Sequence, residues 1–540
     1  MRPLFAAACA AFLSAVACGA DPGEVSQFRI RPYLQNPAPD GMTVRWLSAS
    51  AAPGVLTCDG RTFSSSPVLG REFDYLPNEL ADSQDATLPF LHSVRVTGLE
   101  PATSYPYAVE QDGETIHAVL TTAPRPGEVG RGGGVRLFFY SDCETQPESR
   151  GSRSEWLPSV SLPGGPRPRW VGGRYPVDET TGYRMNLALM AARAAESLRA
   201  GNPVLTSIVG DLVESGGEQR DWDEFWRHNA GRLGSLASRV PIVAALGDHD
   251  NLSGPKSDDP AADMGGYTGP LTLRAAQKFL TYFEHPANGA EDERHQGRYH
   301  RVDFGPVTLL TLDSTNGGTD DGDTDTNHEL DRENASHVPD YAPGSAQHEW
   351  LKRELAAARD RGAITFVQFH HAPFSSGIHG QPPGKDEHSG QPLRPLADLF
   401  HEYGVRAVFS GHDEMYEHSS VDGVHYYDVG IGGDGLPGPA PGVVNERQIF
   451  LAHDHAPERW KGNVLESGGK HYGHVEVDVV RSKSGHGFTV TITPVHVFPV
   501  LDPDAAGEIA DWERRTYDDV VSFEAVGSLS AAGAAEKEGL

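Results

Sequence analysis

Several short apolar runs in this chain of 540 residues end abruptly in turns that carry acidic residues or histidines. Continuous apolar runs of four to eight residues between turn signals are typical of buried strands. Between some of these runs the apolar positions recur with a helical period, most clearly at 187–200 and 346–360. The alternation of strands and helices predicts an α/β fold. The five runs are 135–140, 204–209, 242–246, 364–369 and 405–409.

Every one of these runs is followed by side chains that can bind a metal ion. In open α/β sheets, ligands bind at the carboxyl ends of the strands, where such side chains would meet. A polar loop after one strand is common, but five such loops in order predict a metal site at the edge of a sheet. In chain order the side chains are Asp142 and Glu144, Asp211, Asp248 and His249, His370 and His371, and His412 and Glu414.

The order of these motifs resembles the calcineurin-like metallophosphoesterase superfamily, and within it the bacterial enzymes similar to purple acid phosphatases. The family's blocks are Asp-x-His, Gly-Asp, Gly-Asn-His-Asp/Glu, a His shortly before a Pro, and Gly-His-x-His, and the resemblance covers roughly residues 28–500. It implies a four-layer αββα metallophosphoesterase sandwich over residues 135–500. Residues 501–540 are expected to form a C-terminal extension that is partly disordered. Three β-rich segments agree with this fold, at 424–429, 472–480 and 488–495.

A separate domain is expected before the catalytic part. Residues 42–47 and 92–96 alternate between apolar and polar positions, which predicts an all-β sandwich over residues 28–123. The Leu-x-Pro-x-Thr-x-Tyr stretch at 99–105 resembles the fibronectin type III-like domain that precedes the catalytic domain in plant-type purple acid phosphatases. We interpret this domain as structural support, joined to the rest by a Pro- and Gly-rich linker at 123–134.

The family resemblance assigns ligands to two divalent metal ions. Glu144 and Glu414 stand where the family has histidines, and the resemblance places both on the same metal. A position with only carboxylate ligands suits hard cations such as Mn²⁺, Mg²⁺ or Ca²⁺, whereas one with two imidazoles suits Zn²⁺, Fe²⁺ or Mn²⁺. Glu214 replaces the tyrosine of the purple enzymes, so no charge-transfer colour is expected. The implied ligands are Asp142, Glu144, Asp211 and Glu414 for one metal, and Asp211, Asp248, His370 and His412 for the other.

The resemblance further implies hydrolysis of a phosphate ester by a hydroxide that bridges the two metals. His249 is the expected general acid for the leaving group, and Asp250 is expected to orient it. His371 is either a phosphate contact or a hydrogen-bond donor behind the ligands, and Tyr416 and Arg184 are further candidates for substrate binding. Five carboxylates against two divalent ions leave the site negative, which weakens the binding of a phosphate dianion. The choice between monoester and diester therefore stays open.

A metal-bound scaffold or binding protein on the same fold is the alternative hypothesis. Such a protein would be free to lose His249, His370 and His412, yet the chain keeps all three, which favours an enzyme. The expected partner is then a small-molecule phosphate ester. A formal net charge of -30 argues against a nucleic-acid binding patch, which would be basic. The sequence does not indicate the oligomeric state.

The first 20 residues have the pattern of a signal peptide, with one early positive charge and an apolar, alanine-rich run. Cleavage after Ala17 would leave Cys18 as the first residue. The product would be either an ordinary mature chain or, with a lipid attached to Cys18, a lipoprotein. No later apolar run reaches membrane-spanning length, so the protein is expected to be secreted or periplasmic. Cys58 and Cys143 could form a disulfide, although Cys143 is more simply a small buried residue under the site.

Two loops are further candidates for ligand binding. The acidic stretch at 317–327 resembles a calcium-binding loop but lacks the glycine expected at the sixth position, so an extra calcium ion and a solvated loop are both open. The long insert at 144–184 is rich in Pro, Gly and Arg, and its arginines are candidate substrate contacts.

Overall fold

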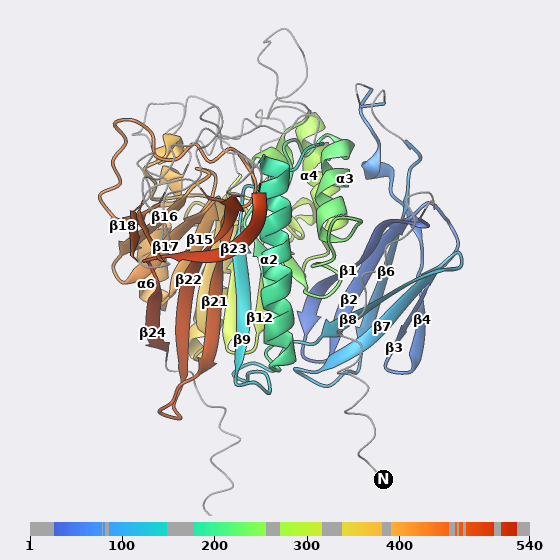
Figure 1. Cartoon of the computed structure of the whole chain (residues 1–540), viewed down its shortest axis with the longest axis horizontal. Coiled ribbons are helices and arrows are strands. Elements are labelled where there is room, and N and C mark those ends of the chain that lie inside the picture. Colours follow the sequence, from blue (N-terminus) through green and yellow to red (C-terminus); the bar gives the residue numbers. More distant parts are fainter. Residues whose placement is uncertain are drawn as a thin grey trace, which may run out of the picture.

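The structure, a computed structural model, describes residues 26–77, 79–80, 86–147, 178–254, 270–315, 337–380, 390–452, 459–461, 464–467, 471–501 and 509–525. It contains a small β-domain beside a larger part built from two packed sheets with helices on the outer faces (Figure 1). The expected leader with Cys18, the stretch at 317–327 and most of the 144–184 insert lie outside the described residues. None of the helices in the described part of the chain combines the length and the apolar character needed to cross a bilayer.

The N-terminal domain is a sandwich of two four-stranded antiparallel sheets, which confirms the predicted all-β fold. Its core forms because alternate residues of each strand face inward, and Trp46, Leu56 and Val109 are fully buried there. One sheet consists of β1 (Phe28–Ala38), β2 (Gly41–Ser48), β6 (Phe90–Thr97) and β5 (Val68–Leu69), and the other of β4 (Arg61–Ser64), β3 (Val55–Cys58), β7 (Ser104–Gln111) and β8 (Glu114–Thr121).

Two larger sheets form the second part of the chain. The nine-stranded sheet has the order β11 (Ile242–Ala244), β10 (Val204–Ile208), β9 (Gly134–Tyr140), β21 (Gly473–Arg481), β22 (Phe488–Leu501), β23 (Ile509–Tyr517), β20 (Val464–Ser467) and β19 (Arg459–Lys461), with β24 (Val521–Ala525) also paired to β22. The seven-stranded sheet has the order β12 (His300–Phe304), β13 (Val307–Thr311), β14 (Ile364–His371), β15 (Ala407–Gly411), β17 (Val424–Val429), β16 (Tyr416–Val421) and β18 (Gln448–Leu451). Strands β9, β10 and β11 are parallel, as are β13, β14, β15 and β17.

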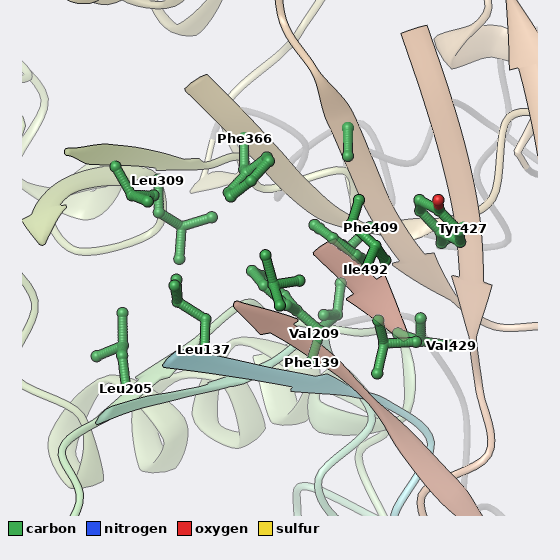
Figure 2. Packing of buried hydrophobic residues seen from close by; sticks show 14 of the residues in the cluster. Leu137, Phe139, Leu205, Val209, Leu309, Phe366, Phe409, Tyr427, Val429 and Ile492 are labelled. Carbon is green, nitrogen blue, oxygen red and sulfur yellow. The ribbon is translucent and has the colours of Figure 1, made fainter. Parts of the chain in front are cut away.

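The side chains of β9 show how the layers form. Phe139 packs into the core between the two sheets, whereas Phe138 faces the helices on the outside. Figure 2 shows Leu137 and Phe139 opposite Phe366 and Phe409 of the other sheet, and the rings of Phe139 and Phe409 stack with centroids 3.8 Å apart. The nine-stranded sheet is covered by α2 (Glu179–Arg199), α3 (Gln219–Asn229) and α4 (Pro270–Tyr282), and the seven-stranded sheet by α5 (Ala346–Asp360) and α6 (Leu396–Tyr403). This is the predicted αββα sandwich.

Short 3₁₀-helices connect some of these elements. They are η2 (Arg71–Phe73), η3 (His249–Asn251), η4 (Glu293–His295), η6 (Ile378–Gly380) and η7 (Gln391–Leu393).

The five predicted strands are present as β9, β10, β11, β14 and β15, and the predicted helix at 346–360 is α5. Helix α2 begins eight residues earlier than expected, because the side chain of Asp178 accepts a hydrogen bond from the backbone N–H of Thr181 and caps it. The sheet continues beyond residue 500, since β23 and β24 both pair with β22. Cys58 and Cys143 are both buried, free thiols.

Acid should destabilise the N-terminal domain through His92. This imidazole is fully buried between the hydroxyls of Ser48 and Ser65, each 2.9 Å from a ring nitrogen. Burial lowers the pKa of His92 to about 4. The unfolded chain, with an ordinary histidine pKa of about 6.5, therefore binds the proton first, and the stabilisation is complete above pH 6.5 and lost as the pH falls towards 4.

The thermal midpoint at pH 7.5 and at pH 5 measures this effect. Because the net charge of the chain also changes with pH, the control is His92→Gln, which keeps hydrogen-bonding groups but does not titrate. Wild type should lose about 4 °C more than this variant between the two pH values. An equal loss in both proteins would contradict the assignment of the acid sensitivity to His92.

Candidate metal centre

Ligand-type side chains gather where the parallel strands of both sheets end. Asp142 follows β9, Asp211 follows β10 and Asp248 follows β11, while His370 is the last residue but one of β14 and His412 follows β15. The two sheets meet at this edge, because the backbone N–H of His412 donates to Oδ1 of Asp142 over 2.8 Å. The predicted site at the carboxyl ends of the strands is therefore one cluster in the structure.

The first group of this cluster contains two carboxylates and two imidazoles. One ligand atom from each of Asp211, Asp248, His370 and His412 lies within 4.8 Å of the others. Nε2 of His370 is 2.9 Å from Oδ2 of Asp211 and 3.0 Å from Oδ1 of Asp248. Nδ1 of His412 is 3.0 Å from the same Asp248 oxygen. All four side chains are almost fully buried, which leaves the centre between them shielded from solvent.

Carboxylates alone form the second group. One carboxylate oxygen from each of Asp142, Glu144 and Asp211 lies within 4.8 Å of the others, and Glu144 forms a similar group with Glu414 and Asp434. Asp211 belongs to both the imidazole-containing and the carboxylate groups, which is the position expected of a ligand shared by two metal ions.

Backbone strain is concentrated at these residues. Asp142, Glu144, Asp211, His412 and Glu414 have positive φ values of 55°, 36°, 50°, 79° and 46°. They make up five of the eleven non-glycine residues with positive φ in the described part of the chain. Because this conformation costs energy for residues with a Cβ atom, its clustering indicates a geometry kept for function.

Glycines next to the ligands allow the carboxylates to approach the backbone. A Cβ atom on Gly411 would lie 2.2 Å from Oδ2 of Asp142, and one on Gly247 would lie 2.0 Å from Oδ1 of Asp211. Any side chain at these positions would displace a carboxylate, which explains why glycine precedes the ligand in these blocks.

The donor set fits divalent cations. Oδ2 of Asp142 is buried and has no hydrogen-bond partner among the described residues. Burial, with repulsion from Asp211, raises the pKa of Asp142 to about 7. Burial and the neighbouring carboxylates of Asp434 and Glu414 also raise the pKa of Glu144 well above its ordinary value. A cation in this group would neutralise charges that the protein alone leaves uncompensated.

His249 lies beside the carboxylate group. Its Nδ1 is 2.9 Å from the backbone oxygen of Glu214 and 3.3 Å from Oε2 of Glu144, and its backbone N–H donates to Oδ1 of Asp211 over 3.0 Å. Because a carbonyl oxygen can only accept, Nδ1 donates to Glu214, and Nε2 is the ring nitrogen that can gain and release a proton.

Asp250 does not orient His249, so that part of the sequence prediction is wrong. Its two carboxylate oxygens accept from the backbone N–H groups of Leu212, over 3.1 Å, and Gly247, over 2.9 Å. Burial, followed by repulsion from Asp211, raises the pKa of Asp250 to about 8. The residue instead ties the loop after β10 to the loop after β11.

Tyr416 is also placed differently from the prediction. Its side chain is fully buried, and its hydroxyl donates to Asp519 over 2.6 Å, in the core between the two sheets. As the first residue of β16 it faces inward, so we no longer expect it to touch a substrate. Arg184 lies half-buried on α2, and no hydrogen bond or ion pair in the described part of the chain links it to the cluster.

His371 lies directly behind the first group. It is fully buried, its Nδ1 is 2.8 Å from the hydroxyl of Ser314, and its Nε2 is 3.9 Å from Oδ1 of Asp248. Burial and the neighbouring His412 and His370 hold the pKa of His371 well below its ordinary value. The ring is therefore neutral, and both predicted roles, phosphate contact and hydrogen-bond donor, remain compatible with its position.

Two residues of the cluster were missed by the sequence analysis. Asp434 follows β17, which runs parallel to β15 and ends at the same edge, so the rule used for the other strands would have found it. His379 lies in η6, and its ring is 3.7 Å from that of His412. No periodic pattern marks His379, because η6 is a single short turn, and the backbone N–H of His379 donates to Asp413.

Comparison with known proteins agrees with this fold. Residues 184–415 match the family model of the calcineurin-like phosphoesterases. The match begins after Asp142 and Glu144 and ends directly after Glu414. No curated protein sequence matches the chain.

Two solved structures share the fold. The purple acid phosphatase PPD1 from yellow lupin (Lupinus luteus) seeds is 16% identical, with a TM-score of 0.53, over 90% of this chain and 74% of the lupin chain. A structure of PhoD is 14% identical, also with a TM-score of 0.53, over 94% of this chain and 92% of that chain. At these identities the likeness shows the fold, and the chemistry has to be argued from the site.

Proposed function

We propose that this protein is an exported phosphoesterase that uses two divalent metal ions to hydrolyse small phosphate esters. The observation that carries the proposal is the position of Asp211, which joins an imidazole-containing group and a carboxylate group at one sheet edge. The family domain at 184–415 supports the reaction class. The leader pattern at 1–20 supports export. We further propose a support domain at 28–123 and a catalytic domain that begins at residue 135, and the pairing of β24 with β22 supports a catalytic domain that includes residues 521–525.

The two cations would have different ligands. Two divalent cations supply water with a lowered pKa and charge to offset the phosphoryl oxygens. The carboxylate position suits Mn²⁺, Mg²⁺ or Ca²⁺, and the imidazole position suits Zn²⁺, Fe²⁺ or Mn²⁺. We assign Asp142, Glu144, Asp211 and Glu414, with Asp434 added, to the first position, and Asp211, Asp248, His370 and His412 to the second.

His249 is the proposed proton donor to the leaving group. The contact between its Nδ1 and the carbonyl of Glu214 fixes the ring and its tautomer, and Nε2 is the nitrogen that would give a proton to the departing alkoxide. His379, beside His412, is the proposed contact for a phosphoryl oxygen, and His371 is a second candidate for that role. Each of these imidazoles can donate a hydrogen bond to an anionic oxygen.

The charge of the site favours a diester. Two divalent cations cannot neutralise the carboxylates of both groups, which now include Asp434 as well as the five predicted ones. A phosphate monoester carries up to two negative charges near neutral pH and a diester carries one, so repulsion is weaker for the diester. We therefore propose that diesters are the preferred substrates.

The test compares two chromogenic esters on the metal-loaded protein. Bis-para-nitrophenyl phosphate should be hydrolysed with a higher kcat/KM than para-nitrophenyl phosphate, and a chelator should abolish both activities. A higher kcat/KM for the monoester would overturn the diester preference while leaving the phosphoesterase proposal intact. No hydrolysis of either ester with any of the candidate metals would overturn the enzyme proposal in favour of a metal-bound scaffold.

A further inference from the structure

The N-terminal domain contacts two helices that follow ligand loops. In the view of Figure 1, α3 and α4 lie between α2 and this domain. The ring of Phe73, in η2 of the N-terminal domain, stacks on Tyr282 of α4 with centroids 4.3 Å apart. Nζ of Lys278, also on α4, donates to the backbone oxygen of Asp74 over 2.9 Å. Residues 71–77 and 79–80 therefore form an interface with the catalytic part.

Glu79 of this segment caps α3 from the other domain. The side chain is fully buried, and its Oε1 accepts from the backbone N–H of Arg220, in the first turn of α3, over 2.8 Å. Its Oε2 accepts from the backbone N–H of Leu76 over 2.5 Å. The residue at the N-cap position of α3 itself, Glu218, makes no side-chain capping bond. A carboxylate at a helix N-terminus satisfies an otherwise unpaired N–H and interacts favourably with the helix dipole.

The loop between Asp211 and α3 is held by backbone hydrogen bonds to the segment that carries His249. The backbone N–H of Gly216 donates to the carbonyl of His249 over 2.8 Å, and that of Gly217 donates to the carbonyl of Leu252 over 2.8 Å. A Cβ atom on Gly216 would lie 1.9 Å from the carbonyl oxygen of Asp250, so the two loops touch directly. The start of α3 thus fixes the segment that holds both the backbone and the ring of His249.

We propose that Glu79 is a positioning residue for His249, acting through the start of α3 and the loop at 211–218. The inference rests on the proposed function, because the role of His249 as proton donor belongs to it. It gives the N-terminal domain a part in catalysis beyond structural support. Loss of the cap should loosen the loop, reduce the fraction of molecules in which His249 is aligned, and lower kcat more than it changes KM.

Three variants of the full-length, metal-loaded protein separate this role from general stability. Glu79→Ala removes the capping oxygen, and Glu79→Gln keeps a side-chain oxygen that can accept from Arg220. Tyr107→Phe is the matched control, since it removes another buried contact between the domains, the hydrogen bond from the Tyr107 hydroxyl to the carbonyl of Ser238, 2.8 Å long. The readouts are kcat, KM and amide hydrogen exchange of peptides that cover 211–222.

Glu79→Ala should lower kcat about fivefold, the effect of losing a typical helix cap, with KM nearly unchanged and faster exchange in 211–222. Glu79→Gln should restore most of the kcat and most of the exchange protection of 211–222, and Tyr107→Phe should change neither kcat nor this exchange. Unchanged kcat or exchange in Glu79→Ala, or an equal loss of kcat in Tyr107→Phe, would overturn the positioning role. If wild type itself has no turnover, the proposed function fails instead, and the exchange data alone then decide whether Glu79 orders the loop.

Discussion

Replacing Asp211 by asparagine should lower turnover by more than about 100-fold, which exceeds the loss typical of residues that only support a metal ligand. Asp211 is the side chain shared by the two ligand groups, and its oxygens also contact His370 and the backbone N–H of His249. Asparagine keeps the shape and one oxygen but removes the negative charge that both proposed cations would need. The measurement is kcat on bis-para-nitrophenyl phosphate together with the number of ions bound per chain.

The matched control for this change is Asp398→Asn, which makes the same substitution on the exposed face of α6. It should leave turnover and metal content at the wild-type level. Full activity of Asp211→Asn with two bound ions would show that Asp211 is not a shared ligand, and the assignment of both groups would then be wrong.

Replacing His249 by alanine should lower kcat by about 100-fold or more on an alkyl ester, since general acid catalysis typically contributes 10²- to 10⁴-fold. The loss should be smaller on para-nitrophenyl esters, because para-nitrophenolate is a stable anion that leaves without needing a proton. The measurement is the loss of kcat in His249→Ala on an alkyl ester compared with the loss on a para-nitrophenyl ester. His486→Ala, at an exposed turn, is the control.

Metal content distinguishes the two roles open to His249, since its ring also groups with Glu144 and Glu214. Loss of kcat with both ions retained is expected of a proton donor. Loss of an ion would show that His249 is a ligand, and an equal loss of kcat for both leaving groups would contradict the proton-transfer role.

The strands and their ends could be predicted from the sequence because a buried parallel strand leaves a strong local pattern. An apolar run such as that of β14, followed at once by His370, needs no knowledge of the rest of the chain. The rule that parallel strands end at one edge then brings distant residues together, and Asp142 and His412 do meet there.

The direction of individual side chains could not be predicted in the same way. Tyr416 is close in sequence to His412, but its place at the start of β16 directs it into the core, towards Asp519 in the segment after residue 500. Asp250 adjoins His249, yet its oxygens face backbone N–H groups of two loops. In both cases packing between distant segments, and not adjacency in sequence, decides which groups are in contact.

The interface of the two domains was invisible in the sequence for a related reason. Glu79 lies in a stretch without periodicity, and its partner Arg220 is 141 positions away. The pattern of the N-terminal domain predicts a β-sandwich but gives no information about which of its loops meets α3. Only the three-dimensional structure connects this domain to the ligand loops.

The central claim is that two cations at this sheet edge carry out phosphoester hydrolysis. The most direct test is a titration of the chelator-stripped protein with Mn²⁺, with bound metal measured by mass spectrometry and turnover of bis-para-nitrophenyl phosphate measured on the same samples. Two Mn²⁺ ions should bind per chain, with turnover that is absent in the stripped protein and complete when both sites are filled. Full turnover in the stripped protein, or no bound Mn²⁺ at saturating concentration, would contradict the central claim.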